Sequence, residues 1–178
     1  MRYVLLLRGI NVGGKNKVSM ADLKKHLTEA GFENTDSYIN SGNLFFDSQE
    51  ELGIIDQQLK ELFQKYYPFV KYYCLLNKHQ YQEDFEQLPI WWQENFARKD
   101  VLFYTKDNQD ELAKSVISQM NLEDEVVYFG RYAIFWGKRT QSLYLKTAYH
   151  KELIKTPLYK EVTVRNGNTY NKIAQYLL

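Results

Sequence analysis

Residues 37–46 read Ser37-Tyr38-Ile39-Asn40-Ser41-Gly42-Asn43-Leu44-Phe45-Phe46. Two short apolar and aromatic runs flank the segment 40–43, whose asparagines, serine and glycine are the residues that a tight turn requires, so the pattern predicts a β-hairpin. Upstream, a strand is predicted at 3–7 and a helix at 19–30, with Ser19 as its N-cap. Because a hairpin follows this helix, the third strand should lie antiparallel between the first two strands.

The remaining elements predict that this arrangement occurs twice. A helix at 50–66 and a strand at 70–76 complete a β-α-β-β-α-β order, which is the ferredoxin-like unit. After a polar and aromatic connector the same order recurs, ending in one additional helix. The expected elements of the second half are a strand at 101–105, a helix at 110–120, a hairpin of 126–129 with 132–136, a broken helical stretch at 148–159, a strand at 162–164 and a helix from an N-cap at Asn168 to Leu178.

We therefore predict an α+β fold of two ferredoxin-like βαββαβ units in tandem with an added C-terminal helix. The predicted division is a first unit at residues 1–77, a connector with a short helix at 78–100, and a second unit plus the C-terminal helix at 101–178.

Composition excludes several classes of protein. The chain has 178 residues, 44% of them hydrophobic and 25% charged, and its net charge of +1 provides no global attraction for nucleic acid. Cys74 is the only cysteine, so an internal disulfide is excluded, and its apolar surroundings predict a buried, inert thiol. No apolar run approaches the length of a membrane span, and the N-terminal apolar run is too short for a signal peptide. We expect a cytoplasmic protein without a membrane partner.

A glycine-rich cationic loop follows the first strand. Exposed backbone N–H groups and positive charge beside a helix N-terminus suit a phosphate or a carboxylate. The loop is not predicted to hydrolyse nucleotides, because Asn16 occupies the position of the magnesium-binding hydroxyl. The alternative interpretation is a solvated loop whose glycines allow positive φ. The candidate ligand-binding residues of this loop are Arg8, Asn11, Gly13, Gly14, Lys15 and Lys17.

Two further segments are candidates for the same site. The hairpin turn should lie at the same sheet edge as the loop, which adds Ser41 and Asn43 as groups that could orient an anion. Arg165 and Asn166 could add contacts if the second unit docks suitably, and the alternative for this segment is a simple turn. Asp22 and His26 lie four residues apart on the predicted helix and could supply two ligands of a metal site. A second pair of ligands at matching spacing is missing, so no metal site is predicted. The sequence names no catalytic residue and no cofactor, and leaves open whether the protein is an enzyme.

Several of these motifs resemble a known family. Residues 6–14, Leu6-Leu7-Arg8-Gly9-Ile10-Asn11-Val12-Gly13-Gly14, and the turn Asn40-Ser41-Gly42-Asn43 closely resemble the bacterial domain of unknown function 1697 family. The stretch Arg165-Asn166-Gly167-Asn168-Thr169 is similar to a second signature of that family, with Gly167 in place of a tryptophan. The resemblance implies a duplicated ferredoxin-like architecture, and it brings no activity or catalytic residue with it.

Three functions follow as hypotheses. The leading one is binding of a small anionic ligand at the loop end of the first unit. The second is binding of single-stranded nucleic acid, since ferredoxin-like sheets can present aromatic side chains to bases, although an RNP motif is missing. The third is a protein-interaction module without a small ligand, for which Trp91 and Trp92 would be exposed anchors. The oligomeric state is not predicted.

Overall fold

The first half of the chain forms a four-stranded antiparallel sheet covered by two helices. The computed structural model describes the backbone of residues 1–178 and the side chains of residues 1–141 and 145–178. The strand order of the first sheet is β2-β3-β1-β4, as the ferredoxin-like prediction requires. Its elements are β1 (Arg2–Leu7), α1 (Met20–Glu29), β2 (Glu33–Tyr38), β3 (Asn43–Asp47), α2 (Leu52–Tyr66) and β4 (Tyr73–Asn77).

The second half repeats this topology. The strand order is β6-β7-β5-β8, again with antiparallel neighbours, so the predicted tandem of ferredoxin-like units is confirmed. The connector contains α3 (Lys78–Glu86) and the 3-10 helix η1 (Ile90–Gln93). The second half contains β5 (Arg98–Phe103), α4 (Gln109–Ile117), β6 (Val126–Phe129), β7 (Ala133–Lys138), η2 (Gln141–Lys146), α5 (Ala148–Lys151), η3 (Leu153–Lys155), α6 (Pro157–Glu161), β8 (Thr163–Asn166) and α7 (Gly167–Leu177).

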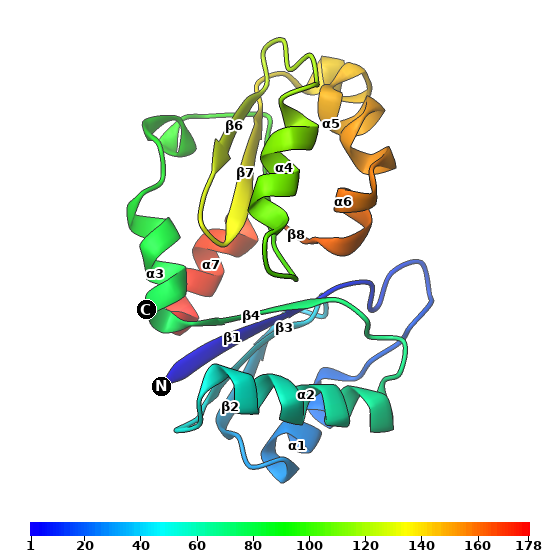
Figure 1. Cartoon of the computed structure of the whole chain (residues 1–178), viewed down its shortest axis with the longest axis vertical. Coiled ribbons are helices and arrows are strands. Elements are labelled where there is room, and N and C mark those ends of the chain that lie inside the picture. Colours follow the sequence, from blue (N-terminus) through cyan, green and yellow to red (C-terminus); the bar gives the residue numbers. More distant parts are fainter.

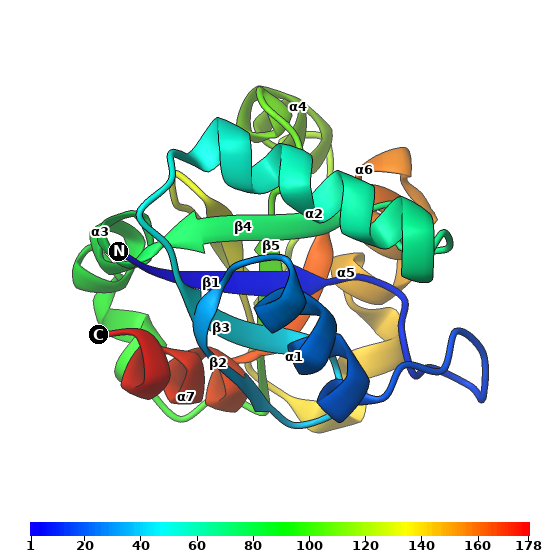
Figure 2. The same cartoon turned by 90° about the horizontal axis from the view of Figure 1, so that it is seen from below.

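The two sheets face each other across a shared apolar core. In Figure 1 the strands of the second sheet run steeply across those of the first, with α3 and α7 at one side of the space between them. Figure 2 shows α1 and α2 on the opposite face of the first sheet. Strand β1 is buried on both faces for this reason: Leu5 packs toward α1 and α2, whereas Leu6 packs toward α7. A strand covered on both faces is a continuous apolar run without polar alternation.

Some element boundaries differ from the prediction. Strand β2 begins at Glu33, four residues before the predicted start, because this polar edge strand lacks the apolar alternation that marks a strand in sequence. The predicted N-cap at Asn168 is wrong. The helix begins earlier because the Asn166 side chain accepts a hydrogen bond from the Thr169 N–H at 2.8 Å.

Candidate functional site

The glycine-rich loop is held against the hairpin turn by one asparagine. The Asn11 side-chain amide donates to the Asn40 carbonyl at 2.8 Å and to the Val18 carbonyl at 3.0 Å. Its oxygen accepts from the Val18 N–H at 2.7 Å. Residues 11–16 themselves form a small turn in which Lys15 donates to the Val12 carbonyl at 3.0 Å. Two segments that are far apart in the sequence are therefore side by side, and Asn11 supplies the contacts between them.

An open hollow of about 550 Å³ lies between these segments and the start of α1. We call it the loop hollow. Among its walls are Gly14 and Lys17 from the loop, Asn40 from the hairpin turn and the first residues of α1. None of its lining residues is acidic, and the first N–H groups of a helix have no partner within the helix. The lining residues are Asn11, Gly14, Lys17, Val18, Ser19, Met20, Ala21 and Asn40.

Arg165 lies beneath the turn rather than in the loop hollow. Its guanidinium donates to the carbonyls of Leu7 at 2.9 Å, Ser41 at 3.1 Å and Gly42 at 3.2 Å, and its Nε donates to the Asn43 side chain. Its Nη1 donates to the Thr163 hydroxyl at 2.9 Å and to the Val164 carbonyl at 2.8 Å, both in its own strand. Burial lowers the pKa of Arg165 to about 10. Arg165 therefore links the second unit to the hairpin turn of the first unit by hydrogen bonds.

Arg8 turns away from the glycines toward the second unit. One guanidinium nitrogen, Nη1, donates to the Val162 carbonyl, and its Cζ lies 5.6 Å from the ring centroid of Tyr159. Partial burial lowers its pKa, and neighbouring tyrosines oppose that shift. Arg8 is not among the residues that line the loop hollow.

The ten residues predicted to bind a ligand therefore do not form one site. Asn11, Gly14 and Lys17 line the loop hollow, and Gly13 and Lys15 are exposed in the same loop. Arg8 contacts the second unit. The side chains of Ser41 and Asn43 hydrogen-bond to each other at 3.0 Å, beside Arg165, and Asn166 caps α7.

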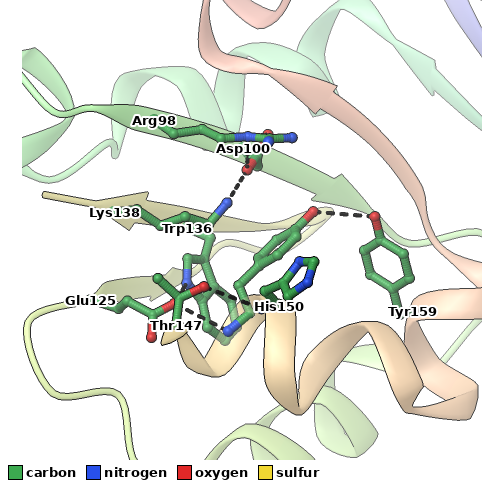
Figure 3. A network of polar contacts seen from close by, with 9 residues as sticks. Arg98, Asp100, Glu125, Trp136, Lys138, Thr147, His150 and Tyr159 are labelled. Carbon is green, nitrogen blue, oxygen red and sulfur yellow. Dashed lines mark hydrogen bonds and ion pairs between the residues drawn. The ribbon is translucent and has the colours of Figure 1, made fainter. Parts of the chain in front are cut away.

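A buried polar network in the second unit was not predicted from sequence (Figure 3). Asp100 and Lys138 are each 1% exposed and form an ion pair, to which Arg98 adds a contact of 3.0 Å. Lys138 also lies 3.5 Å from the ring centroid of Tyr149, whose hydroxyl donates to that of Tyr159 at 3.4 Å. The sequence did carry a signal for this pair, because side chains two residues apart in a strand share a face. Asp100 is therefore on the face of the core residue Leu102, and Lys138 is on the face of the core residue Trp136.

Glu125 organises the polar contacts beside this pair. Its carboxylate accepts from the Trp136 indole at 2.9 Å and from the backbone of Ala148 at 2.6 Å and Tyr149 at 3.1 Å. These groups hold the start of α5 against β7 (Figure 3). Both oxygens of this buried carboxylate accept hydrogen bonds within the protein, which is the arrangement of a structural group.

The aromatic side chains considered for contacts with nucleic acid or protein are mostly buried. The aromatic residues of the central sheet faces, Phe45 and Phe135, are both 0% exposed, so neither face is open for stacking on bases. The expectation that both tryptophans are exposed is wrong for Trp92, which is 2% exposed and packs between the sheets. Trp91 is half-buried and stacks on Phe96 at 5.5 Å.

Other site types are also limited by the structure. Burial raises the pKa of the Cys74 thiol to about 12. Among the side chains that the structure describes, no group of three metal-binding residues is present. Across the described helices, none combines the length and apolar character that crossing a membrane requires.

Comparisons with known proteins agree with the fold. The solved structure of the conserved bacterial protein SP0830 from Streptococcus pneumoniae is similar to this chain, with 47% sequence identity and a TM-score of 0.95. The similarity covers 99% of this chain and 98% of that one. No curated protein matches the sequence. The family model described as protein of unknown function DUF1697 matches residues 1–135, and the chain belongs to this family.

Proposed function

We propose that the protein binds a small anionic ligand, through a phosphate or carboxylate group, in the loop hollow. The supporting observation is the composition of its walls: Lys17, Asn40 and the first two residues of α1, Met20 and Ala21, border one open space that no acidic residue lines. Backbone N–H groups and the helix dipole both favour an anion at such a position.

Free donors are present in these walls. Within the described part of the chain, the N–H groups of Met20, Ala21 and Gly14 make no hydrogen bond to protein. The side chain of Ser19 is already engaged, because it accepts from the Asp22 N–H at 3.3 Å. An entering oxyanion would therefore meet backbone donors and one flexible cation, without displacing an existing contact.

Calorimetric titration with a panel of phosphorylated and carboxylated metabolites tests this proposal. We expect at least one ligand to bind, and we expect Lys17→Gln to weaken its affinity about tenfold through loss of a charge-assisted contact. Lys172→Gln is the control, because Lys172 is a half-buried lysine of α7 that contacts Gln175 and the Tyr176 ring and does not line the loop hollow. Equal affinity of wild type and Lys17→Gln, or no binding by any ligand of the panel, would contradict the proposal.

A further inference from the structure

Arg8 differs from the other arginines of the chain in its partners. Four arginines form ion pairs with a carboxylate, at N···O distances from 2.9 to 3.7 Å: Arg2 with Asp47, Arg98 with Asp100, Arg131 with Glu83, and Arg139 with Glu94. Arg165 is fully hydrogen-bonded to carbonyl and side-chain oxygens. Arg8 has one side-chain hydrogen bond, to the Val162 carbonyl, and no carboxylate partner among the described side chains.

The position of Arg8 fixes which part of its guanidinium remains available. Its backbone N–H donates to the Tyr72 carbonyl at 3.1 Å, which anchors the residue beside β4. Nη1 is used by Val162, and the guanidinium lies over the Tyr159 ring. The Nε and Nη2 edge therefore keeps its N–H donors, and an arginine can bind an oxyanion through two parallel hydrogen bonds from this edge.

Tyr159 contributes a second donor from the other unit. Its hydroxyl accepts the hydrogen bond from Tyr149 at 3.4 Å, so its own proton is left to donate. Glu161, two residues after Tyr159, does not pair with Arg8. Its carboxylate forms an ion pair with Lys106 at 2.9 Å and accepts a hydrogen bond from the Gln109 side chain at 3.3 Å. A half-buried cation and a hydroxyl donor are thus presented together, one from each ferredoxin-like unit.

We infer that Arg8 and Tyr159 form an oxyanion-binding site at the junction of the two units, separate from the loop hollow. The ligand would carry a phosphate or carboxylate group that accepts two hydrogen bonds from Arg8 and one from the Tyr159 hydroxyl. The cation–π contact with the Tyr159 ring holds the guanidinium in place before the ligand arrives, which reduces the entropy lost on binding. The site bridges α6 and the residue that follows β1, so an occupied site would join the two units more firmly.

Titration with sodium phosphate, followed by NMR, tests the inference at single groups. The Arg8 Nε–H signal reports the junction and the Ala21 backbone N–H signal reports the loop hollow, so the two proposals can fail separately. Sodium chloride at matched ionic strength controls for screening, and the Nε–H of the ion-paired Arg131 is an internal reference. We expect saturable movement of the Arg8 signal with phosphate, and a parallel titration with acetate shows whether carboxylates also bind.

Two conservative variants decide the assignment. Tyr159→Phe keeps the ring beside Arg8 and removes the hydroxyl. Arg8→Lys keeps the positive charge and removes the guanidinium that can donate two parallel hydrogen bonds. We expect the phosphate affinity reported by Arg8 in Tyr159→Phe to fall about tenfold. In the Lys17→Gln background, where binding in the loop hollow is weakened, we expect Arg8→Lys to lose the remaining protection by phosphate in thermal unfolding. In Lys17→Gln the Arg8 titration should be unchanged.

Three outcomes would overturn the inference. They are an Arg8 signal that phosphate and acetate do not move beyond the chloride control, an unchanged affinity in Tyr159→Phe, or loss of the Arg8 response in Lys17→Gln. The last result would mean that the loop hollow is the binding site and that Arg8 only senses it.

Discussion

At the scale of single residues, the two arginines at the junction, Arg8 and Arg165, donate to uncharged oxygen atoms and form no ion pair with a described carboxylate. Arg165 is buried, and removal from water lowers its pKa to about 10, which still leaves the group charged at neutral pH. The carbonyls of Leu7, Ser41 and Gly42 replace its hydration shell. A buried cation is tolerated only when each of its donors is used in this way.

We predict that Arg165→Met is among the most destabilising single changes in this protein. It leaves the acceptors of the hairpin turn buried without a donor, and the expected loss is about 3–5 kcal/mol of unfolding free energy. Urea denaturation measures the loss. Arg139→Met is the matched control, since Arg139 is half-exposed and pairs with Glu94 at 3.7 Å, and its loss should stay below about 1 kcal/mol. Similar losses in both variants would show that the Arg165 contacts are not special.

The buried thiol predicts a pH dependence with a defined sign. The pKa of Cys74 is about 12 in the folded chain against an ordinary value of 9.0, so the folded state retains a proton that the unfolded state releases. Unfolding free energy should therefore fall as pH rises above about 9, and Cys74→Ala should show a smaller fall over the same range. Denaturant titrations of both proteins at several alkaline pH values check this. Parallel curves would contradict the prediction, because the tyrosines titrate in both proteins.

At the scale of elements, α3 supports the hairpin of the second sheet. The Asp84 carboxylate, on α3, accepts from the N–H groups of Arg131 at 2.7 Å and Tyr132 at 2.8 Å. Burial raises the pKa of Asp84, and these hydrogen bonds oppose the rise. Gly130 leaves room for this carboxylate, since a Cβ there would lie 2.7 Å from an Asp84 oxygen.

We predict that Gly130→Ala destabilises the protein by about 1–3 kcal/mol, because the added methyl group displaces Asp84 from the turn. Thermal and urea unfolding measure the effect. Gly53→Ala in α2 is the matched control: no atom lies within 4 Å of its added Cβ, and removing a glycine from a helix should stabilise by about 0.4–1 kcal/mol. Equal stability of Gly130→Ala and wild type would show that Asp84 can move without cost.

At the scale of the whole molecule, the two units share one core. Residues of β1, β3 and β4 pack in the same cluster as residues of β5, β7 and α7. In Figure 1, α3 and α7 lie beside both sheets. Neither sheet can lose α7 without exposing apolar surface, so the units should unfold together.

The shared core is tested by Ile173→Ala. Ile173 is 0% exposed, and its truncation should cost about 2–5 kcal/mol and lower hydrogen-exchange protection in both β1 and β5. Ile54→Ala, at a position that is 48% exposed in α2, should change stability by less than about 0.5 kcal/mol. Loss of protection in one sheet alone would mean that the units unfold independently.

The sequence alone determined the order of elements and the duplicated fold. Turn residues at 40–43, the Ser19 cap and the apolar run of β1 are local signals, and they act through backbone conformation and hydrogen bonds over a few residues. The proximity of the glycine-rich loop and the hairpin turn also followed, because topology fixes which strand ends share a sheet edge.

Only the tertiary structure decided how the polar residues are used. Arg8, Arg165 and Lys138 are equivalent as cations in the sequence, yet one lies half-buried at the junction, one is saturated by carbonyls and one pairs with Asp100 in the core. Their roles depend on which groups the docking of the two units brings within hydrogen-bond distance. That docking is set by the packing of α3, α7 and both sheets, through contacts between residues far apart in the chain.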